Sequence, residues 1–204
     1  MANIYLVRHE KVSGPAALYG HSDVDVATEL QAKLADKINQ SLRFQHVITS
    51  PLKRCNELCK VLTRQAANLT YEVSPHLQEM NFGDIDGVPF NQLAEFEDQL
   101  DEFSRNPATT SLPNAESLSE FHGRVVEKWW ELCKTVKQDT LIVTHGGVIR
   151  MILSEVLKLD WKQAELYNKL QIRNATVTHL ELFSEHGYWV SVKSIGAPLT
   201  DSVS

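Results

Sequence analysis

The chain has 204 residues, a length typical of one α/β domain, and its 43% hydrophobic residues are enough to form a buried core. Its formal net charge is -6, from 20 lysine and arginine residues against 26 aspartate and glutamate residues. Nucleic-acid affinity depends on clustered cations, so this mildly acidic chain without a basic tract argues against a nucleic-acid partner. A small phosphorylated substrate stays compatible with it, because such a substrate needs only a few cations placed locally.

The sequence gives no sign of a membrane or secreted protein. No apolar run approaches the roughly 20 residues that span a bilayer, and the run 2–7 is too short for the core of a signal peptide. The three cysteines, Cys55, Cys59 and Cys133, cannot all pair, and we expect them to be small buried side chains in a reducing compartment. The expected location is therefore the cytoplasm, with no membrane partner.

Hydrophobic periodicity predicts strands alternating with helices. Strands are expected at 3–7, 46–49, 71–73 and 140–144 and in a terminal pair at 175–183 and 188–195; helices are expected at 27–42, from Ser50 (N-cap) and Pro51 onward, and at 148–157. The stretch 88–137 is acidic and helical, with a break near 106–113.

This order of elements predicts an α/β fold with a mostly parallel sheet and helices on both faces. Residues 1–204 form one domain in this interpretation, and about 88–137 form a helical excursion over the carboxyl edge of the sheet. The terminal strand pair offers an edge through which a homodimer could form.

Chemically active side chains follow each of the four inner strands. In an open α/β sheet, ligands bind just outside the carboxyl ends of the strands, so residues widely separated in sequence converge there. The residues that this placement predicts to meet are Arg8, His9, Arg54, Glu79 and His145, with Gly146 and Gly147 at the start of the next helix.

Each of these residues suits phosphoryl transfer. A neutral imidazole such as His9 is a good nucleophile near pH 7. Arg8 and Arg54 offer bidentate donors that match phosphate oxygens, and His145, when protonated, adds a third cation. The amide groups of Gly146 and Gly147, at a helix N-terminus, can contribute further donors. Glu79 can protonate the leaving oxygen and later deprotonate the water that attacks the phosphohistidine.

The motifs that carry these residues resemble those of the histidine phosphatase superfamily, which has the phosphoglycerate mutase-like fold. They read LVRHE at 6–10, TSPLKRC at 49–55, LQEMNFGDIDG at 77–87 and VTHGG at 143–147. The resemblance implies His9 as nucleophile, Arg8, Arg54 and His145 as the phosphate pocket, Glu79 as proton donor, and neither a metal nor a cofactor.

The chain departs from the family pattern at three places. Glu10 stands where the family has glycine, and we expect its side chain to point away from the phosphate site. Residues 12–16 replace a polar run that ends in a phosphate-binding asparagine, so some phosphate contacts must differ. The family's Gly-Gly-Glu-Ser element reads NAES at 114–117, where we interpret Glu116 as a capping or first-turn acid.

The segment LYGHSDV at 18–24 resembles the α-ribazole phosphatase branch of the family, which acts in cobalamin assembly. This resemblance implies that Tyr19, Gly20 and His21 line the mouth of the substrate site. The predicted activity is hydrolysis of a phosphomonoester, α-ribazole 5′-phosphate first among them.

Three alternatives remain open at the level of sequence. A phosphoglycerate mutase or a broad-specificity phosphatase would share the same catalytic residues. An idle interaction module could use Trp129 and Trp130 as an anchor, although such a pair more often has one buried and one half-exposed ring. A metallophosphatase is disfavoured because no two of the 8 histidines have the sequence spacing typical of metal ligands.

Overall fold

The computed structural model describes residues 1–66, 68–185 and 187–199. The regular elements, in chain order, are β1 (Ala2–Arg8), α1 (Thr28–Ser41), β2 (His46–Thr49), α2 (Lys53–Gln65), β3 (Thr70–Val73), the 3-10 turns η1 (Pro75–Leu77), η2 (Gly83–Ile85), η3 (Phe90–Gln92) and η4 (Ala94–Phe96), α3 (Glu97–Arg105), α4 (Leu118–Thr135), β4 (Thr140–Thr144), α5 (Gly146–Leu157), α6 (Glu165–Asn168), β5 (Thr176–Phe183) and β6 (Trp189–Pro198).

One six-stranded sheet has the order β3-β2-β4-β1-β5-β6. The first four strands of this order are parallel, whereas β5 and β6 pair antiparallel at one side. The central pair β1 and β4 is in register from Ile4 opposite Thr140 to Arg8 opposite Thr144, so both strands end at the same level. The predicted α/β class and mostly parallel sheet are confirmed.

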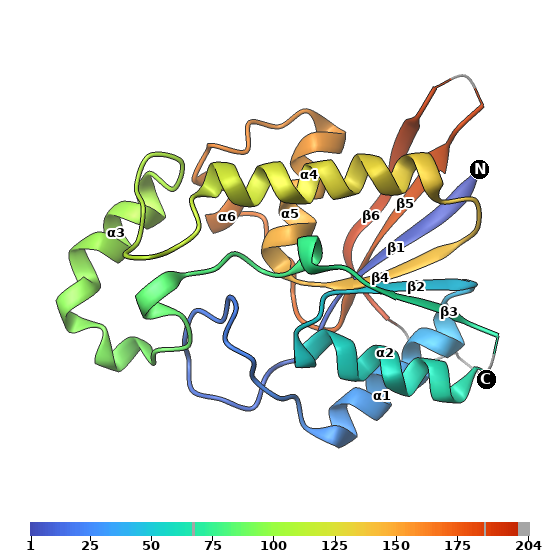
Figure 1. Ribbon diagram of the computed structural model, residues 1–204, viewed down its shortest axis with the longest axis horizontal. Coiled ribbons are helices and arrows are strands. Elements are labelled where there is room, and N and C mark those ends of the chain that lie inside the picture. Colours follow the sequence, from blue (N-terminus) through green and yellow to red (C-terminus); the bar gives the residue numbers. More distant parts are fainter. Residues whose placement is uncertain (67, 186, 200–204) are drawn as a thin grey trace.

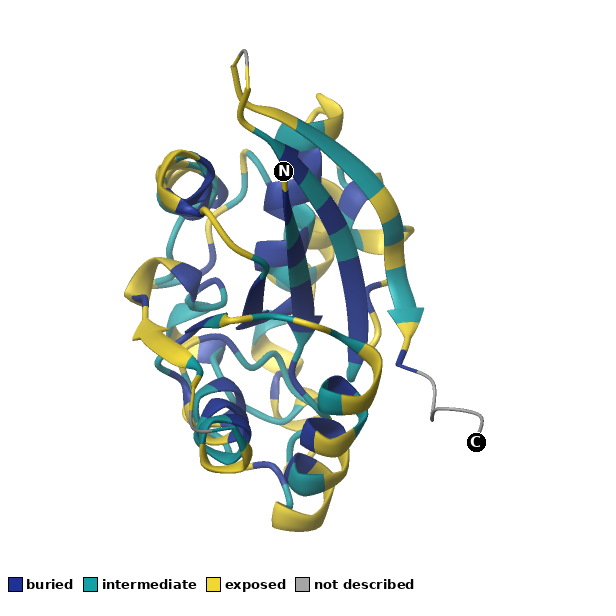
Figure 2. Ribbon diagram, turned by 90° about the vertical axis from the view of Figure 1, so that its right-hand side faces the viewer, coloured by how far each residue is buried: buried dark blue, intermediate teal, exposed yellow. Residues whose placement is uncertain are grey.

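Helices cover both faces of the sheet (Figure 1). Side chains alternate along each strand: Ile4 and Leu6 of β1 pack in a core under α4 and α5, whereas Val7 packs in a second core under α1 and α2. The same alternation in β4 sends Ile142 to the first core and Leu141 to the second. Figure 2 shows the resulting dark band of buried strand residues between helices exposed on their outer sides.

The excursion is shorter than the sequence predicted. Only the turns η3 and η4, helix α3 and the loop 106–117 project past the carboxyl ends of the strands (Figure 1). Helix α4 packs on the sheet, because Phe121, Val125 and Trp129 form an apolar face that belongs to the core under β1 and β4. This helix therefore belongs to the layer that covers the sheet.

The predicted start of the second helix was wrong. Helix α2 begins at Lys53, after an extended Leu52, and not at Pro51. Ser50 faces the site instead, where its Oγ contacts His145 Nε2 at 2.8 Å. The Asp23 carboxylate accepts the amide hydrogen of Lys53 at 2.7 Å, so a loop residue satisfies the first turn of this helix.

The tryptophan pair and the cysteines are placed as expected. Trp129 is fully buried in the core, whereas Trp130 is half-buried and donates its indole N–H to Glu155 at 3.1 Å. Cys55, Cys59 and Cys133 are all free and buried. Within the described part of the chain, no helix has the length and apolar character needed to cross a membrane.

The contrast between the two tryptophans predicts different costs of truncation. Trp129→Ala empties a fully buried site and should lower the free energy of unfolding by about 3–5 kcal/mol. Trp130→Ala should cost about 1–2 kcal/mol, because its ring already contacts solvent on one side. Urea unfolding of both variants at pH 7 measures the difference; equal losses would contradict the packing of α4 on the sheet.

Candidate active site

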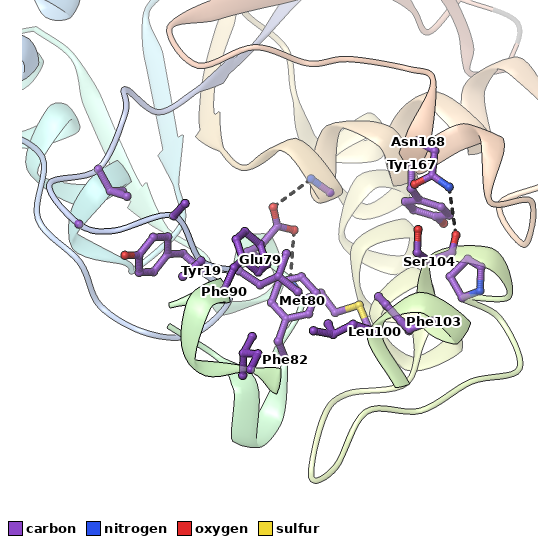
Figure 3. Close-up of a pocket in the computed structure, with 18 of the residues that line it drawn as sticks. Tyr19, Glu79, Met80, Phe82, Phe90, Leu100, Phe103, Ser104, Tyr167 and Asn168 are labelled. Carbon is purple, nitrogen blue, oxygen red and sulfur yellow. Dashed lines mark hydrogen bonds between the residues drawn. The ribbon is translucent and has the colours of Figure 1, made fainter. Parts of the chain in front are cut away.

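A pocket of about 1000 Å³ lies between the carboxyl ends of the strands and the excursion. Its polar end contains Arg8, His9, Glu79, Gly147 and Arg150. Its other walls are mainly apolar and include aromatic rings from segments far apart in the sequence, several of which Figure 3 labels. The lining rings are Tyr19, Phe82, Phe90, Phe103, Phe121 and Tyr167.

His9 is held in one tautomer by the backbone. Its Nδ1 lies 2.7 Å from the carbonyl oxygen of Glu10, and because a carbonyl only accepts, Nδ1 carries the hydrogen. Burial, together with the charges of Arg54 and Arg8, holds the pKa of the His9 imidazole well below its usual value. The ring is therefore neutral, and its Nε2 lone pair is free to attack an electrophile.

His145 lies beside His9, with ring centroids 5.1 Å apart. Arg54 donates its Nε hydrogen to His145 Nδ1 at 3.2 Å, so the ring hydrogen is on Nε2 and is donated to Ser50 Oγ at 2.8 Å. Burial, followed by the charges of Arg54, His9 and Arg8, lowers the pKa of His145 well below its usual value. These contacts and the lowered pKa favour the neutral ring, and the third cation that a protonated His145 would supply stays a prediction.

Arg54 is completely buried behind the two histidines. It donates to the carbonyl oxygens of Tyr19, Gly20 and Ser22 at 3.0, 2.5 and 2.8 Å. Counting the bond to His145, four of its five N–H donors are engaged, and the second hydrogen of Nη1 takes no part in these bonds, although Arg54 is not among the residues that line the pocket. The loop 19–22 thus satisfies a buried guanidinium, which explains why this loop runs under the edge of the sheet.

Asp86 holds the opposite side of the same loop. Its carboxylate accepts the amide hydrogens of Gly20, His21 and Ser22 at 3.1, 2.7 and 3.0 Å, and that of Phe82 at 3.2 Å. Burial alone would raise the pKa of Asp86, but these hydrogen bonds outweigh it and the pKa is lowered. The loop 19–22 is therefore fixed between Arg54 and Asp86.

Arg8 and Arg150 form a pair of cations in the pocket wall. A Cβ atom added to Gly146 would lie 3.2 Å from Arg150 Nη1 and 3.4 Å from Arg8 Nε, so both guanidinium groups flank the first turn of α5. Arg8 donates to the carbonyl of Ile172 at 2.5 Å, and Arg150 to that of Leu170 at 2.9 Å. Two carbonyls of one loop thus fix both cations.

Glu79 faces the pocket opposite these arginines. Its Oε2 accepts the amide hydrogen of Gly147 at 3.0 Å, and its Oε1 accepts that of Met80 at 3.1 Å (Figure 3). The Gly147 amide therefore binds Glu79, whereas the sequence had suggested that it would bind phosphate. The carboxyl group of Glu79 therefore stands beside the first turn of α5.

The residues expected at the mouth of the pocket are only partly there. Tyr19 lines it, with its hydroxyl donated to the Pro15 carbonyl at 2.8 Å. Gly20 is buried, and a Cβ atom at its position would collide with Met80 and Asp86, so this glycine permits a close contact between loops. His21 is exposed and is not part of the wall, and neither is Gly146.

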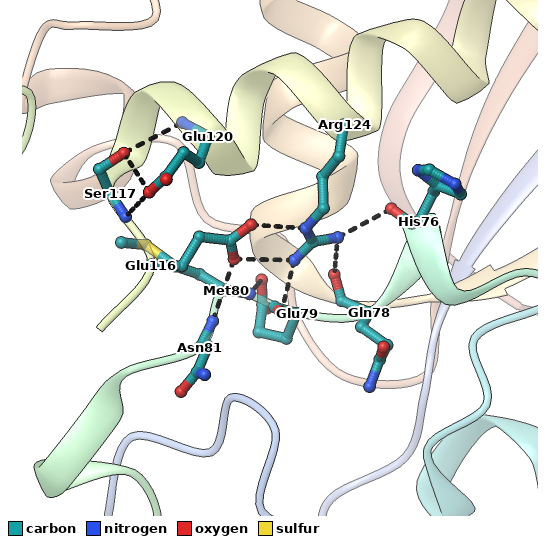
Figure 4. Close-up of polar contacts among 9 residues, drawn as sticks. All are labelled: His76, Gln78, Glu79, Met80, Asn81, Glu116, Ser117, Glu120 and Arg124. Carbon is teal, nitrogen blue, oxygen red and sulfur yellow. Dashed lines mark hydrogen bonds and ion pairs between the residues drawn. The ribbon is translucent and has the colours of Figure 1, made fainter. Parts of the chain in front are cut away.

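The departures from the family pattern have structural explanations. The Glu10 carboxylate accepts the Lys11 amide hydrogen at 2.8 Å and does not line the pocket, as expected. Residues 12 and 14–16 form part of the pocket wall. The interpretation of Glu116 as a capping acid was wrong: Ser117 is the N-cap of α4 and forms a capping box with Glu120, whereas Glu116 binds Arg124 (Figure 4).

Several residues of the site were missed by the sequence reasoning. Arg150 follows the VTHGG motif by three residues, a spacing that could have placed it near the first turn of the helix. Asn174, which donates to the His9 carbonyl at 3.0 Å, and the carbonyls of 170 and 172 lie in a segment without recognisable pattern. Among the described residues, no group of three or more His, Cys, Asp or Glu side chains is arranged to hold a metal ion.

The two histidine tautomers predict distinct NMR behaviour. Because the pKa of His9 and that of His145 are lowered, both rings should stay neutral at the pH at which an unperturbed histidine, with a pKa of about 6.5, becomes protonated. His9 should carry its hydrogen on Nδ1 and His145 on Nε2. Nitrogen-15 spectra of the imidazoles, assigned with His9→Gln, measure this; a normal titration of His9 would contradict it.

Asp86→Asn should weaken the fold and disorder the loop 19–22. The amide cannot accept all four backbone hydrogens as the charged carboxylate does, and we expect a loss of about 2–3 kcal/mol at pH 7. The pKa of Asp86 is lowered in the folded state, so its contribution is complete above about pH 5 and is lost as pH falls through that lowered value. Urea unfolding of both proteins from pH 7 to pH 3 should show the difference shrinking; a constant difference would contradict this assignment.

The family model of the histidine phosphatase superfamily (branch 1) matches residues 4–194. Phosphoglycerate mutase-like protein 4 of Arabidopsis thaliana is 27% identical over 199 residues, covering 94% of this chain and 84% of the relative. A broad-specificity phosphatase of Saccharomyces cerevisiae is 25% identical, covering 95% of this chain and 84% of the relative.

The fold has close matches among solved structures. The α-ribazole phosphatase of Shigella flexneri superimposes with a TM-score of 0.79 at 16% identity, covering 96% of each chain. At this identity the likeness concerns the fold alone. The family match spans all the motifs of the site, from the strand before His9 to the terminal strand pair. The chain belongs to the histidine phosphatase superfamily.

Proposed function

We propose that the protein hydrolyses small phosphomonoesters through a covalent phosphohistidine at His9. The observation that carries this proposal is the 2.7 Å hydrogen bond from His9 Nδ1 to the Glu10 carbonyl. It leaves an unprotonated Nε2 in a pocket wall that also contains two guanidinium groups, those of Arg8 and Arg150. A nucleophile with its lone pair available is thus placed beside the cations that a phosphoryl group needs.

The reaction has two steps. In the first, His9 Nε2 forms a bond to phosphorus while the bond from phosphorus to the ester oxygen breaks, and Glu79 gives its proton to that oxygen. In the second, a water molecule attacks phosphorus, Glu79 takes its proton, and the bond to Nε2 breaks. The sum is ester plus water giving alcohol plus phosphate. Arg8, Arg150 and the remaining Nη1 hydrogen of Arg54 are the donors for the phosphoryl oxygens.

The pocket wall favours hydrolysis of an ester with an apolar or aromatic leaving group. The excursion residues that line the pocket include Phe90, Leu100 and Phe103 together with Glu97 and Asp101, and within the described chain none of them is a lysine or arginine. Arg105 is exposed and pairs with Asp101 at 3.8 Å. On the side of the excursion, a second phosphate or a carboxylate on the substrate would meet this apolar and acidic wall unfavourably, which disfavours phosphoglycerate mutase chemistry, although Lys11 lines another part of the pocket.

Among such esters we propose α-ribazole 5′-phosphate as the physiological substrate, which places the protein in cobalamin biosynthesis. Its flat benzimidazole ring and uncharged ribose suit a wall of Phe90, Phe103 and Tyr167. The segment 18–24 supports the same branch of the family, with Tyr19 in the wall. A broad-specificity phosphatase is the second candidate, because the same apolar surface accepts other aromatic or alkyl phosphates.

The test is phosphate release in excess chelator from α-ribazole 5′-phosphate, 3-phosphoglycerate and p-nitrophenyl phosphate. His9→Ala should lower kcat/KM at least about a thousandfold, and no covalent phosphoenzyme should form. His46→Ala is the matched control, since His46 lies at the amino end of β2, away from the pocket, and this variant should act like wild type.

Each result has a defined meaning. Selective release from α-ribazole 5′-phosphate supports both chemistry and substrate, whereas release from the aryl phosphate alone keeps the His9 chemistry and discards the cobalamin substrate. Formation of 2-phosphoglycerate without phosphate release would establish a mutase. Release that is indifferent to His9 would overturn the proposed mechanism, whereas no release from any of the three substrates would favour an idle binding module.

A further inference from the structure

We propose that Arg124 and Glu116 are positioning residues for Glu79, which they hold through the main chain. This inference rests on the role proposed for Glu79 as proton donor. Arg124 lies on α4, in the layer that covers the sheet, and Glu116 lies immediately before the N-cap of that helix (Figure 4). Neither residue lines the pocket.

Every N–H donor of Arg124 is used in contacts that hold the segment around Glu79. Its Nη1 donates to the carbonyls of His76 and Gln78 at 2.8 and 2.9 Å, and its Nη2 donates to the carbonyl of Glu79 at 2.9 Å. The remaining two N–H groups form a bidentate pair with Glu116 at 2.6 and 3.0 Å. All five guanidinium hydrogens are thus engaged, so Arg124 has none left for a substrate.

Glu116 fixes the chain on the other side of Glu79. Its Oε2 accepts the Asn81 amide hydrogen at 3.2 Å, and its own amide donates to the Asn81 carbonyl at 3.0 Å. The pair is mostly buried, with side chains 20% and 14% exposed, so solvent cannot readily replace its bonds. Arg124 and Glu116 together therefore hydrogen-bond the main chain at 76, 78, 79 and 81, on both sides of the catalytic residue Glu79.

The remaining contacts of Glu79 explain why these main-chain hydrogen bonds affect the position of its carboxyl group. Its carboxylate is held by the amides of Gly147 and Met80, and Gly147 belongs to the first turn of α5. Helices α4 and α5 pack in one core. The main chain of Glu79 is bonded to Arg124 of α4, whereas its side chain is bonded to the Gly147 amide of α5. A shift of the segment 78–81 away from α4 would move the carboxylate relative to His9, and proton donation is sensitive to such shifts.

A loss of positioning has a signature that a loss of stability lacks. Protonation of the leaving oxygen matters for an alkyl phosphate, whose alkoxide is a poor leaving group, and matters little for p-nitrophenyl phosphate. Arg124→Gln should therefore lower kcat/KM about a hundredfold for an alkyl phosphate such as glycerol 1-phosphate, and less than about fivefold for the aryl ester. Glu116→Gln, which keeps the carbonyl bonds of Arg124, should show the same selectivity with a smaller loss.

Lys128 provides a matched control on the same helix. It is also a buried cation with two carboxylate partners, Glu72 and Glu131 at 3.0 Å each, but it ties α4 to β3 and lies one turn beyond Arg124. Lys128→Gln should affect both substrates equally and weakly. Melting temperatures of all variants identify those that are folded, and Glu116→Gln carries the test if Arg124→Gln fails to fold.

Glu79→Gln distinguishes the failure of this inference from the failure of the proposed function. If Glu79→Gln shows the leaving-group selectivity and the Arg124 and Glu116 variants lose both substrates equally or neither, the positioning role is overturned and the acid role of Glu79 stands. If Glu79→Gln itself shows no selectivity, both fall together. Selectivity in the Lys128→Gln control would also overturn the positioning role.

Discussion

The complete burial of the Arg54 guanidinium is the constraint on which the rest of the site depends. A charge without solvent must find polar partners, and Arg54 finds three carbonyls in the loop 19–22 and the ring of His145. Those carbonyls can point inward only if the amides of the same loop point outward, where Asp86 accepts three of them. Burying one side chain therefore fixes two loops and sets the tautomer of one histidine.

The electrostatic consequence is a site that needs an anion. Arg54 and Arg8 lie close to both histidines, and their charges, added to burial, lower the pKa of both rings. Among the described residues in the pocket wall, Glu79 is the carboxylate that stands beside these cations, whereas Glu10 lies outside the wall and accepts the Lys11 amide hydrogen. A phosphoryl dianion would compensate the excess positive charge. The same excess keeps the His9 nucleophile unprotonated until that anion arrives.

The framework of this site could be predicted from the sequence because strand ends have a clear signature. His9, Arg54, Glu79 and His145 each follow a strand, and the parallel register of these strands brings them to one edge. The structure places these residues together as that reasoning requires. The rule is geometric, so it needs no knowledge of which side chain contacts which.

The supporting contacts could not be predicted for an equally physical reason. His9, Arg8, Arg150 and Arg124 are all oriented by backbone carbonyls, and every residue type has a carbonyl. Their positions depend on loops whose paths are set by tertiary packing. The predicted helix start at Ser50 was wrong for a related reason. The Ser50 hydroxyl accepts a hydrogen bond from His145, and the first-turn amide of Lys53 is bonded instead to Asp23, thirty residues earlier in the chain.

The division between sheet and excursion separates chemistry from substrate choice. The nucleophile, the arginines and Glu79 are positioned by the ends of the strands and by α4 and α5. These strands and helices pack together in the cores of the sheet. Much of the apolar wall comes from η3, η4 and α3, which contain no buried residue of their own. Their side chains Phe96, Leu100 and Phe103 pack on a small separate core of Ile85, Leu93 and Leu112. Substitutions in the excursion can therefore change the shape of the leaving-group wall without moving His9, because no hydrogen bond that orients the nucleophile or the arginines originates there. A different substrate requires a new excursion surface, whereas a different reaction would require rebuilding the edge of the sheet itself.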